Sequence, residues 1–303
     1  MKPCGVLLLD KPEGLSSNHA LQRTRRLLGS PKAGHVGSLD PLATGMLPIC
    51  VGEATKIAGE ILGGRKCYEF TLQLGARTDT GDREGTVIER TASPQISAPE
   101  LDAVLAGFLG PQTQVPPMYS ALKRDGQPLY RLARAGIEVE RAPRQIEIHA
   151  LALLQLTPEA LRLEVLCSKG TYVRTLGEDI ARALGSCGHL AQLRRRYVEP
   201  FAAYPMLTLE ALEALVRGGA TPSLLAPDEA LAGIPAIALP ATAAQRLRQG
   251  QALALGAATT LGAAAAEPGR VRLYEQGGCF LGLGELDPAG LVRPKRLFAA
   301  PDA

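Results

Sequence analysis

The sequence predicts an α+β protein that ends in a small β domain. Residues 66–75 alternate apolar and polar side chains, with Tyr68, Phe70, Leu72 and Leu74 on one face, as in a half-buried strand. Other segments also have the composition of strands, and amphipathic segments with helical spacing lie among them. Towards the C-terminal end, short alternating segments separated by glycines indicate a β module.

Local signals define the expected elements in chain order. Ser16 or Ser17 is suited to cap a helix that Gly29 ends, and glycines and prolines recur through 34–50, which is therefore expected to be a loop. The elements expected up to residue 185 are a strand at 5–10, helices at 18–28 and 53–62, a strand at 66–75, a turn at 77–85, a strand at 86–90, helices at 98–110 and 128–136, strands at 144–156 and 160–168, and a helix at 171–185.

Near residue 236 the sequence changes to short alternating segments separated by glycines, which predicts a domain boundary. We expect a larger domain over 1–236 and a second domain of roughly 65 residues over 237–303. Within the second domain, residues 257–266 are rich in alanine and carry little structural information.

Composition indicates a soluble globular protein of one to three domains. The chain has 303 residues, of which 46% are apolar and 21% charged. Asp10 interrupts the short apolar run near the N-terminus, which argues against a signal peptide, and no window is apolar enough to cross a membrane. The six cysteines lie far apart, so reduced thiols and a cytoplasmic location are expected.

Positive charge is concentrated in three segments, although the net charge is only +3. Residues 22–32 carry four cations and no acid, residues 120–145 carry six cations against three acids, and residues 194–196 are three consecutive arginines. Each segment alone is typical of a solvated surface. Together they favour a face that binds a polyanion such as nucleic acid.

Several common catalytic motifs are missing from the sequence. There is no G-x-G-x-x-G after a strand, no Walker loop, no H-E-x-x-H and no G-x-S-x-G. Cys187 and His189 are the nearest pair of possible metal ligands, and two ligands in a loop do not make a zinc site. We therefore expect neither a cofactor nor a metal.

One carboxylate stands out because the backbone around it is constrained. Asp40 lies between Leu39 and Pro41 in a glycine-rich stretch that holds no other acid before Glu53. A carboxylate in this setting could act as a nucleophile, a base or an electrostatic support. Arg174, where a strand passes to a helix, is the candidate cation that would keep it ionised, although its motif alone favours a helix arginine in solvent.

Two aromatic residues have open alternatives. Tyr68 is more often a core residue on such a strand, but it could stack on a base if the face borders a cleft. His35 could be an enclosed loop histidine or a side chain that faces a ligand.

Five ordered motifs carry a resemblance to a known family. They are LDKPEGLSSNHAL (9–21), GHVGSLDPLATGMLPICVGEATK (34–56), KCYEFTLQLGARTDTGDREG (66–85), PPMYSALK (116–123) and CSKGTYVRTL (167–176). The chain resembles the bacterial TruB family, the tRNA pseudouridine-55 synthases, from its N-terminus to about Pro200, and its tail resembles a PUA domain. Val36 departs from the threonine usual in this family, which puts a local hydrogen bond in doubt.

The resemblance implies a fold and a reaction. The fold would be a mixed, mainly antiparallel central sheet flanked by helices, with a small β-barrel-like PUA domain for RNA binding. The reaction would isomerise the T-loop uridine at position 55 of elongator tRNAs without a cofactor. Asp40 would be the catalytic aspartate, acting either by nucleophilic attack or by removal of the ribose 2′ proton. Arg174 would be its basic partner, and Tyr68 the stacking residue and proton acceptor at C5.

The resemblance also assigns binding residues. Tyr172 and Leu193 would line the uracil pocket, Lys11 would support the site, and His35 would wedge into the T loop as the base flips out. The basic segment 120–145 would grip the T arm of tRNA as a thumb, and its RNA-backbone residues would be Lys123, Arg124, Arg131 and Arg134.

Three rival functions remain at this stage. A guide-RNA-dependent relative is disfavoured by the thumb-like segment 120–145, so no guide RNA is expected. A tRNA-binding or tRNA-folding protein in which catalysis is secondary is compatible with the basic segments. An N-glycosidase would release free uracil. We expect a monomer that binds tRNA and no membrane.

Overall fold

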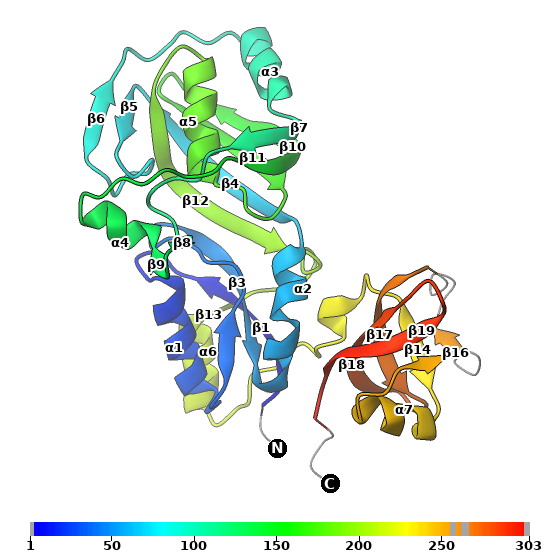
Figure 1. Ribbon diagram of the computed structural model, residues 1–303. Coiled ribbons are helices and arrows are strands. Elements are labelled where there is room, and N and C mark those ends of the chain that lie inside the picture. The colour runs from blue at the N-terminus through cyan, green and yellow to red at the C-terminus, as the bar shows by residue number, and fades with distance from the viewer. Residues whose placement is uncertain (1–2, 255–258, 262–266, 300–303) are drawn as a thin grey trace.

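The computed structural model describes residues 3–254, 259–261 and 267–299, and its larger body is built on one nine-stranded sheet (Figure 1). The strand order is β13-β1-β3-β12-β4-β11-β10-β7, and β2 pairs with β3 beside this path. The strands are β1 (Gly5–Lys11), β2 (Ala33–His35), β3 (Thr44–Val51), β4 (Lys66–Leu74), β7 (Gly110–Gln114), β10 (Arg144–Leu156), β11 (Ala160–Cys167), β12 (Gly188–Val198) and β13 (Leu207–Thr208).

The pairing directions make this sheet mixed and mainly antiparallel. β13 pairs with β1 and β12 pairs with β3 in parallel. The remaining neighbours pair antiparallel. The fold class expected from the sequence is therefore confirmed.

β12 joins two halves of this sheet. On one side it pairs with β3, and on the other it pairs with β4 along most of its length. The contact with β3 consists of two residue pairs, Arg194 with Thr44 and Arg195 with Gly45. Figure 1 shows β12 running from the half with β4, β10 and β11 towards the half with β1 and β3.

Helices cover both halves of the sheet. The side chain of Ser16 caps α1, whose buried face includes Ala20, Leu21 and Thr24, as the apolar spacing predicts. α1 and α6 lie side by side at the half with β1 and β3, whereas α5 packs on β12 and β4 (Figure 1). The helices of this body are α1 (Ser17–Leu27), η1 (Gly52–Ile57), α2 (Ala58–Gly63), α3 (Ala98–Gly107), α4 (Leu129–Arg134), α5 (Val173–Ala183), α6 (Leu209–Arg217) and η2 (Glu229–Leu231).

Several sequence-based expectations need correction. Residues 44–51 are not loop but β3, a strand inside the sheet. Pro48 has no N–H to donate, but its carbonyl accepts a hydrogen bond from the Val36 N–H at 2.8 Å. Gly45 fits because its φ of +98° lets the backbone of Arg195 approach closely. The helix expected at 53–62 is split into η1, a 3₁₀ helix, and α2. The helix expected at 98–110 ends at Gly107, and β7 begins at Gly110.

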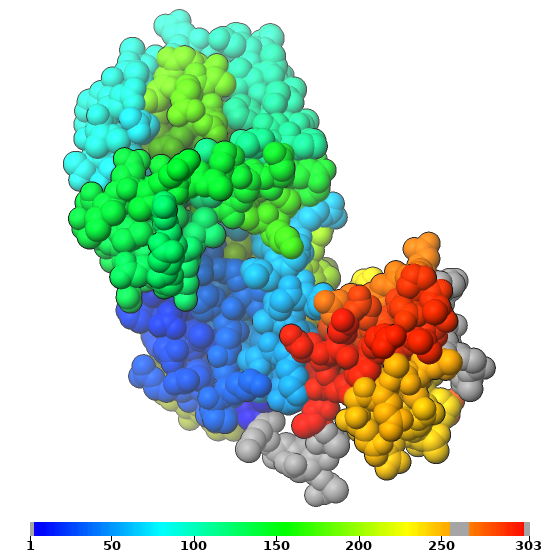
Figure 2. Space-filling model, in the orientation of Figure 1, coloured from blue at the N-terminus to red at the C-terminus, as the bar shows by residue number. Residues whose placement is uncertain are grey.

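The basic segment 120–145 projects between β7 and β10. It contains a two-residue hairpin, β8 (Lys123–Arg124) with β9 (Gln127–Pro128), followed by α4. Figure 2 shows the green residues of this region lying across the middle of the visible face. A second hairpin, β5 (Ala76–Thr78) with β6 (Val87–Arg90), follows β4.

The C-terminal residues form a second sheet with its own core. Its order is β15-β19-β18-β17-β14-β16, and buried side chains such as Ile237, Leu247 and Leu273 pack together there. The elements are β14 (Ala236–Leu239), α7 (Ala241–Arg248), β15 (Leu253–Ala254), β16 (Thr259–Leu261), β17 (Gly269–Glu275), β18 (Cys279–Leu286) and β19 (Leu291–Leu297). Most of the alanine-rich run expected at 257–266 lies outside the described residues.

Hydrogen bonds join the second sheet to the larger body. Lys56 Nζ on η1 donates to the carbonyl of Leu297 at 2.7 Å, and the Ala299 N–H donates to the Glu53 carboxylate at 3.2 Å. Among the helices that the structure describes, none is long and apolar enough to span a membrane.

Candidate active site

Asp40 lies in the loop between β2 and β3, and neighbouring contacts fix this loop. The hydroxyl of Ser17, in the first turn of α1, donates to the Leu39 carbonyl at 2.9 Å and accepts from the Leu39 N–H at 2.7 Å. The Ala43 N–H donates to the Asp40 carbonyl at 3.1 Å, which closes a turn around Pro41. The carboxylate is therefore presented from a rigid backbone, as its sequence context suggests.

The structure brings Arg174 into contact with Asp40. Arg174 Nη2, from the first turn of α5, lies 3.0 Å from Asp40 Oδ2. The Arg174 side chain is only 5% exposed, whereas that of Asp40 is 42% exposed and so can be reached from solvent. Arg174 is held in place by donating to the carbonyls of Thr80 at 2.7 Å and Tyr119 at 2.5 Å.

A second acid, Asp82, lies on the other side of Arg174, and sequence reasoning missed it. Its Oδ2 is 3.8 Å from Arg174 Nη1, and its side chain is 5% exposed. Its Oδ1 accepts from the Thr80 hydroxyl at 2.6 Å and the Glu84 N–H at 3.1 Å. The segment 77–85 was expected to be turn chemistry only. The sequence signal that could have revealed Asp82 is the polar side chain at every second position, Thr78, Thr80 and Asp82.

The pKa of the Asp40 carboxyl is raised, because burial outweighs the nearby positive charges. Loss of water raises the pKa of the Asp40 carboxyl, the guanidinium of Arg174 opposes that shift, and the charge of Asp82 reinforces it. Lys11 also opposes it. Because the ion pair with Arg174 favours the ionised form, it supports Asp40 as a carboxylate.

Lys11, expected to support the site, is fully buried. Its ammonium donates to the carbonyls of Leu15 at 2.6 Å, Pro12 at 2.8 Å and Pro41 at 3.4 Å. Burial lowers its pKa to about 8, and the charge of Asp40 partly offsets this. Lys11 therefore ties the end of β1 to the loop that carries Asp40.

Tyr68 and Leu193 lie in the same buried cluster, on the adjacent strands β4 and β12. Tyr68 is 9% exposed, so most of its ring contacts protein. Burial raises the pKa of the Tyr68 phenol, and the nearby guanidinium of Arg195 opposes the rise. The sequence left a core role and a base-stacking role open, and this partial burial is compatible with both.

His35 lies on the short strand β2, not in a loop, opposite Ile49 of β3. It is half-buried, and its Nδ1 is buried without a hydrogen-bond partner among the described residues. Burial lowers the pKa of His35, and the charge of Arg195 lowers it further. The ring is therefore held in its neutral form with one polar atom unsatisfied.

The remaining predicted site residues are Tyr172 and the cations of the basic segment 120–145. Tyr172 is the N-cap residue of α5, where the guanidinium of Arg144 stacks 4.6 Å from its ring centroid. The predicted RNA-backbone residues lie on the basic segment 120–145 and do not contact Asp40. They are Lys123 and Arg124 on β8 and Arg131 and Arg134 on α4.

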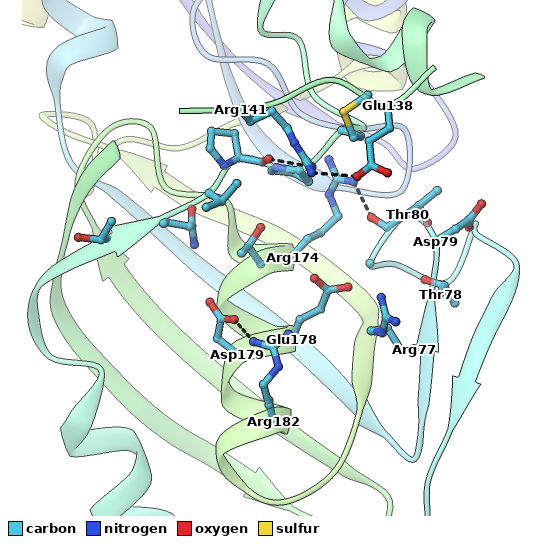
Figure 3. A pocket seen from close by; sticks show the side chains of 18 residues that line it. Arg77, Thr78, Asp79, Thr80, Glu138, Arg141, Arg174, Glu178, Asp179 and Arg182 are labelled. Atoms are coloured by element: carbon cyan, nitrogen blue, oxygen red, sulfur yellow. Dashed lines mark hydrogen bonds and ion pairs between the residues drawn. The ribbon is translucent and has the colours of Figure 1, made fainter. Parts of the chain in front are cut away.

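A polar pocket of about 530 Å³ borders Arg174 but not Asp40. Figure 3 shows its lining side chains from α5, the segment after β5 and the basic segment 120–145. Two ion pairs lie within it, Arg141 with Glu138 at 3.3 Å and Arg182 with Asp179 at 2.7 Å. Within the described residues, no group of three or more histidine, cysteine or acidic side chains is placed to hold a metal ion.

Comparisons with known proteins agree over nearly the whole chain. The family model for the N-terminal domain of TruB family pseudouridylate synthase matches residues 25–173. The model for the tRNA pseudouridylate synthase B C-terminal domain matches 174–230, and that for the C-terminal part of pseudouridine synthase II TruB matches 235–298.

Curated relatives and a solved structure extend this agreement. The chain is 53% identical to tRNA pseudouridine synthase B of Aromatoleum aromaticum, over 97% of this chain and 92% of that protein. It is 49% identical to the protein of the same name from Nitrosococcus oceani, over 97% and 94%. A chain in the crystal structure of a Cbf5-Nop10-Gar1 complex shares the fold, with a TM-score of 0.75 and 22% identity over 97% of this chain and 85% of that one. On these matches, the chain belongs to the TruB family of pseudouridylate synthases.

Proposed function

We propose that this chain converts the T-loop uridine at position 55 of elongator tRNAs to pseudouridine, with Asp40 as the catalytic carboxylate. As a member of the TruB family, the chain is a tRNA pseudouridine synthase. The observation that carries the assignment is the solvent-accessible Asp40 held 3.0 Å from the buried guanidinium of Arg174. Position 55 rests on the five ordered sequence motifs.

The reaction breaks the bond between ribose C1′ and uracil N1, turns the base and joins C1′ to C5, after which C5 loses its proton. Asp40 either attacks the sugar or base, or removes the ribose 2′ proton so that the bond breaks by elimination. In both routes the carboxylate must be ionised, which the ion pair with Arg174 favours. No atom is gained from a cofactor in either route.

Tyr68 and Leu193 would hold the uracil against the floor of the site, with Tyr172 at its side. Burial favours the neutral Tyr68 phenol, so this ring is suited to stacking. If Tyr68 also accepts the C5 proton, its phenol must lose its own proton as the C5–H bond breaks.

The target uridine must leave the RNA stack before its glycosidic bond can be reached, at a cost of a few kcal/mol. A neutral His35 can enter the gap left by the base without the penalty of burying a charge. The domain of residues 1–236 would then carry catalysis, and residues 237–303 would form a PUA-like domain that binds RNA. The protein would act as a monomer without a guide RNA.

A T-arm RNA hairpin labelled with tritium at uridine C5 tests the catalytic assignment. Wild-type protein in EDTA should release tritium without free uracil, whereas Asp40→Asn should release none and bind the hairpin within a few-fold of wild-type affinity. Free uracil would instead indicate an N-glycosidase. Tight binding by wild type without release would favour a tRNA-binding protein, for which the basic segments are the supporting observation.

A salt titration tests the basic segment 120–145. We expect the triple change of Lys123, Arg131 and Arg134 to alanine to weaken hairpin binding and to flatten the plot of log affinity against log salt by about 0.9 for each lost phosphate contact. Arg217→Ala is the matched control, because its side chain is 78% exposed and lies on α6. An unchanged slope in the triple variant would exclude the segment from the contact surface.

A further inference from the structure

Arg195 is a fully buried cation with no acid beside it. Its side chain is 1% exposed, and among the described residues no carboxylate lies within ion-pair distance of it. Nε donates to the Met46 carbonyl at 2.7 Å, and Nη2 donates to the Gly37 carbonyl at 2.9 Å. Burying a guanidinium without a counter-charge is costly, so an apolar side chain would be the expected choice for stability alone.

Two glycines lie close to Arg195, one beside its guanidinium and one beside its backbone carbonyl. At Gly37, whose φ is +71°, an added Cβ would lie 3.2 Å from Arg195 Nη1. At Gly45, whose φ is +98°, an added Cβ would lie 2.2 Å from the Arg195 carbonyl oxygen. Both glycines belong to the stretch that flanks Asp40. Arg195 is therefore built into the loop that presents the carboxylate.

The position of Arg195 on β12 links this loop to Tyr68. In the sheet register Arg195 lies between Gly45 of β3 and Tyr68 of β4. Its charge opposes the rise in the pKa of the Tyr68 phenol and adds to the lowering of the pKa of His35. One cation thus acts on both aromatic side chains that the proposed function uses.

We propose that Arg195 is a positioning residue for the isomerisation. Its guanidinium fixes the spacing between the His35–Gly37 segment and Tyr68, so that the His35 and Tyr68 side chains keep their relative positions while the uridine flips. This inference rests on the proposed function. None of the proposed roles places Arg195 against the reacting atoms. It acts through its hydrogen bonds to the carbonyls of Gly37 and Met46.

Arg195→Met tests this inference, because methionine is long and apolar and leaves no buried charge unpaired. Single-turnover tritium release on the T-arm hairpin should slow at least tenfold, while the dissociation constant for the hairpin stays within threefold. The matched control is Arg162→Met on β11 of the same sheet, whose exposed side chain pairs with Glu69. The control should keep both values within twofold.

Arg195→Lys provides a second variant if the methionine variant does not fold. It keeps the charge but loses the planar fork that reaches two carbonyls, so we expect a rate at least threefold below wild type with normal affinity. If Arg195 had only a structural role, its replacement would lower the melting temperature and the number of RNA-binding sites, but not the rate per bound site.

Two results would overturn the inference. One is a wild-type rate in a folded Arg195→Met or Arg195→Lys variant, and the other is an equal loss of rate in Arg162→Met. A wild-type protein that releases no tritium would overturn the proposed function itself, so the two failures are distinguishable.

Discussion

Replacing Arg174 with methionine should affect both the unfolding free energy and the reaction rate, and the two effects can be measured separately. Arg174 pairs with Asp40 and Asp82 and donates to two backbone carbonyls. Without the guanidinium, the Asp82 carboxylate remains 95% buried with no cation beside it, since its side chain is 5% exposed. Breaking such a buried pair costs about 3–5 kcal/mol of unfolding free energy. For a domain of this size that corresponds to a fall in melting temperature of roughly 6–20 °C.

Adding Asp82→Asn to Arg174→Met should restore part of this stability. The amide oxygen of asparagine can still accept from the Thr80 hydroxyl and the Glu84 N–H, and no buried charge is left unpaired. We expect the double variant to recover at least about 2 kcal/mol in urea unfolding. It should not recover tritium release, because Asp40 still lacks its partner.

The pH dependence of the rate provides an independent check. Arg174 opposes the burial that raises the pKa of Asp40, so its loss should raise that pKa further. The proposed reaction needs the ionised Asp40 carboxylate, so its rate should rise with pH through this pKa. In Arg174→Met the acidic limb of the residual single-turnover rate should have its midpoint at higher pH than in wild type. A midpoint that stays or moves lower, or a double variant no more stable than the single one, would refute the charge-pairing argument.

Two further predictions concern His35 and Gly45. The folded-state pKa of His35 is lowered, so its contribution to stability is present above its unfolded value of 6.5 and is lost as pH falls below it. The unfolding free energy of His35→Gln should consequently fall less from pH 7 to pH 5 than that of wild type. Urea unfolding measures this fall, and an equal fall in the two proteins would contradict the prediction. Gly45→Ala should destabilise the protein by at least about 2 kcal/mol, since alanine is strained at positive φ and would overlap the Arg195 carbonyl. Gly34→Ala, which has open space around the added Cβ, should stay within about 0.5 kcal/mol of wild type in the same assay.

Local sequence patterns predicted the elements whose formation depends on neighbouring residues. The alternation at 66–75 gave β4 because one face of that strand is buried and the other is not. Ser16 predicted the start of α1 because its hydroxyl accepts from the His19 N–H. The rigid setting of Asp40 could also be inferred locally, from the residues on either side of it.

Features that depend on long-range pairing could not be predicted in this way. β3 has the glycines and proline of a loop, and it becomes a strand because β1 and β12 pair with it on its two sides. Asp82 resembles a turn residue until the fold places it against Arg174, which is 92 positions away in the chain numbering. Arg195 sits among three arginines, and only the register of β12 shows which one is buried.

The two-pair contact between β12 and β3 therefore has a consequence for catalysis. Asp40 belongs to the half of the sheet with β1 and β3, whereas Tyr68 belongs to the half with β4. The spacing between these two residues passes through the pairing of Arg195 with Gly45, which a single Cβ at residue 45 would disrupt. In the proposed reaction the uracil turns between the Asp40 carboxylate and the Tyr68 ring, so its rate would depend on that spacing. Changes at this strand contact should alter the rate of isomerisation even though they add or remove no group that reacts with RNA.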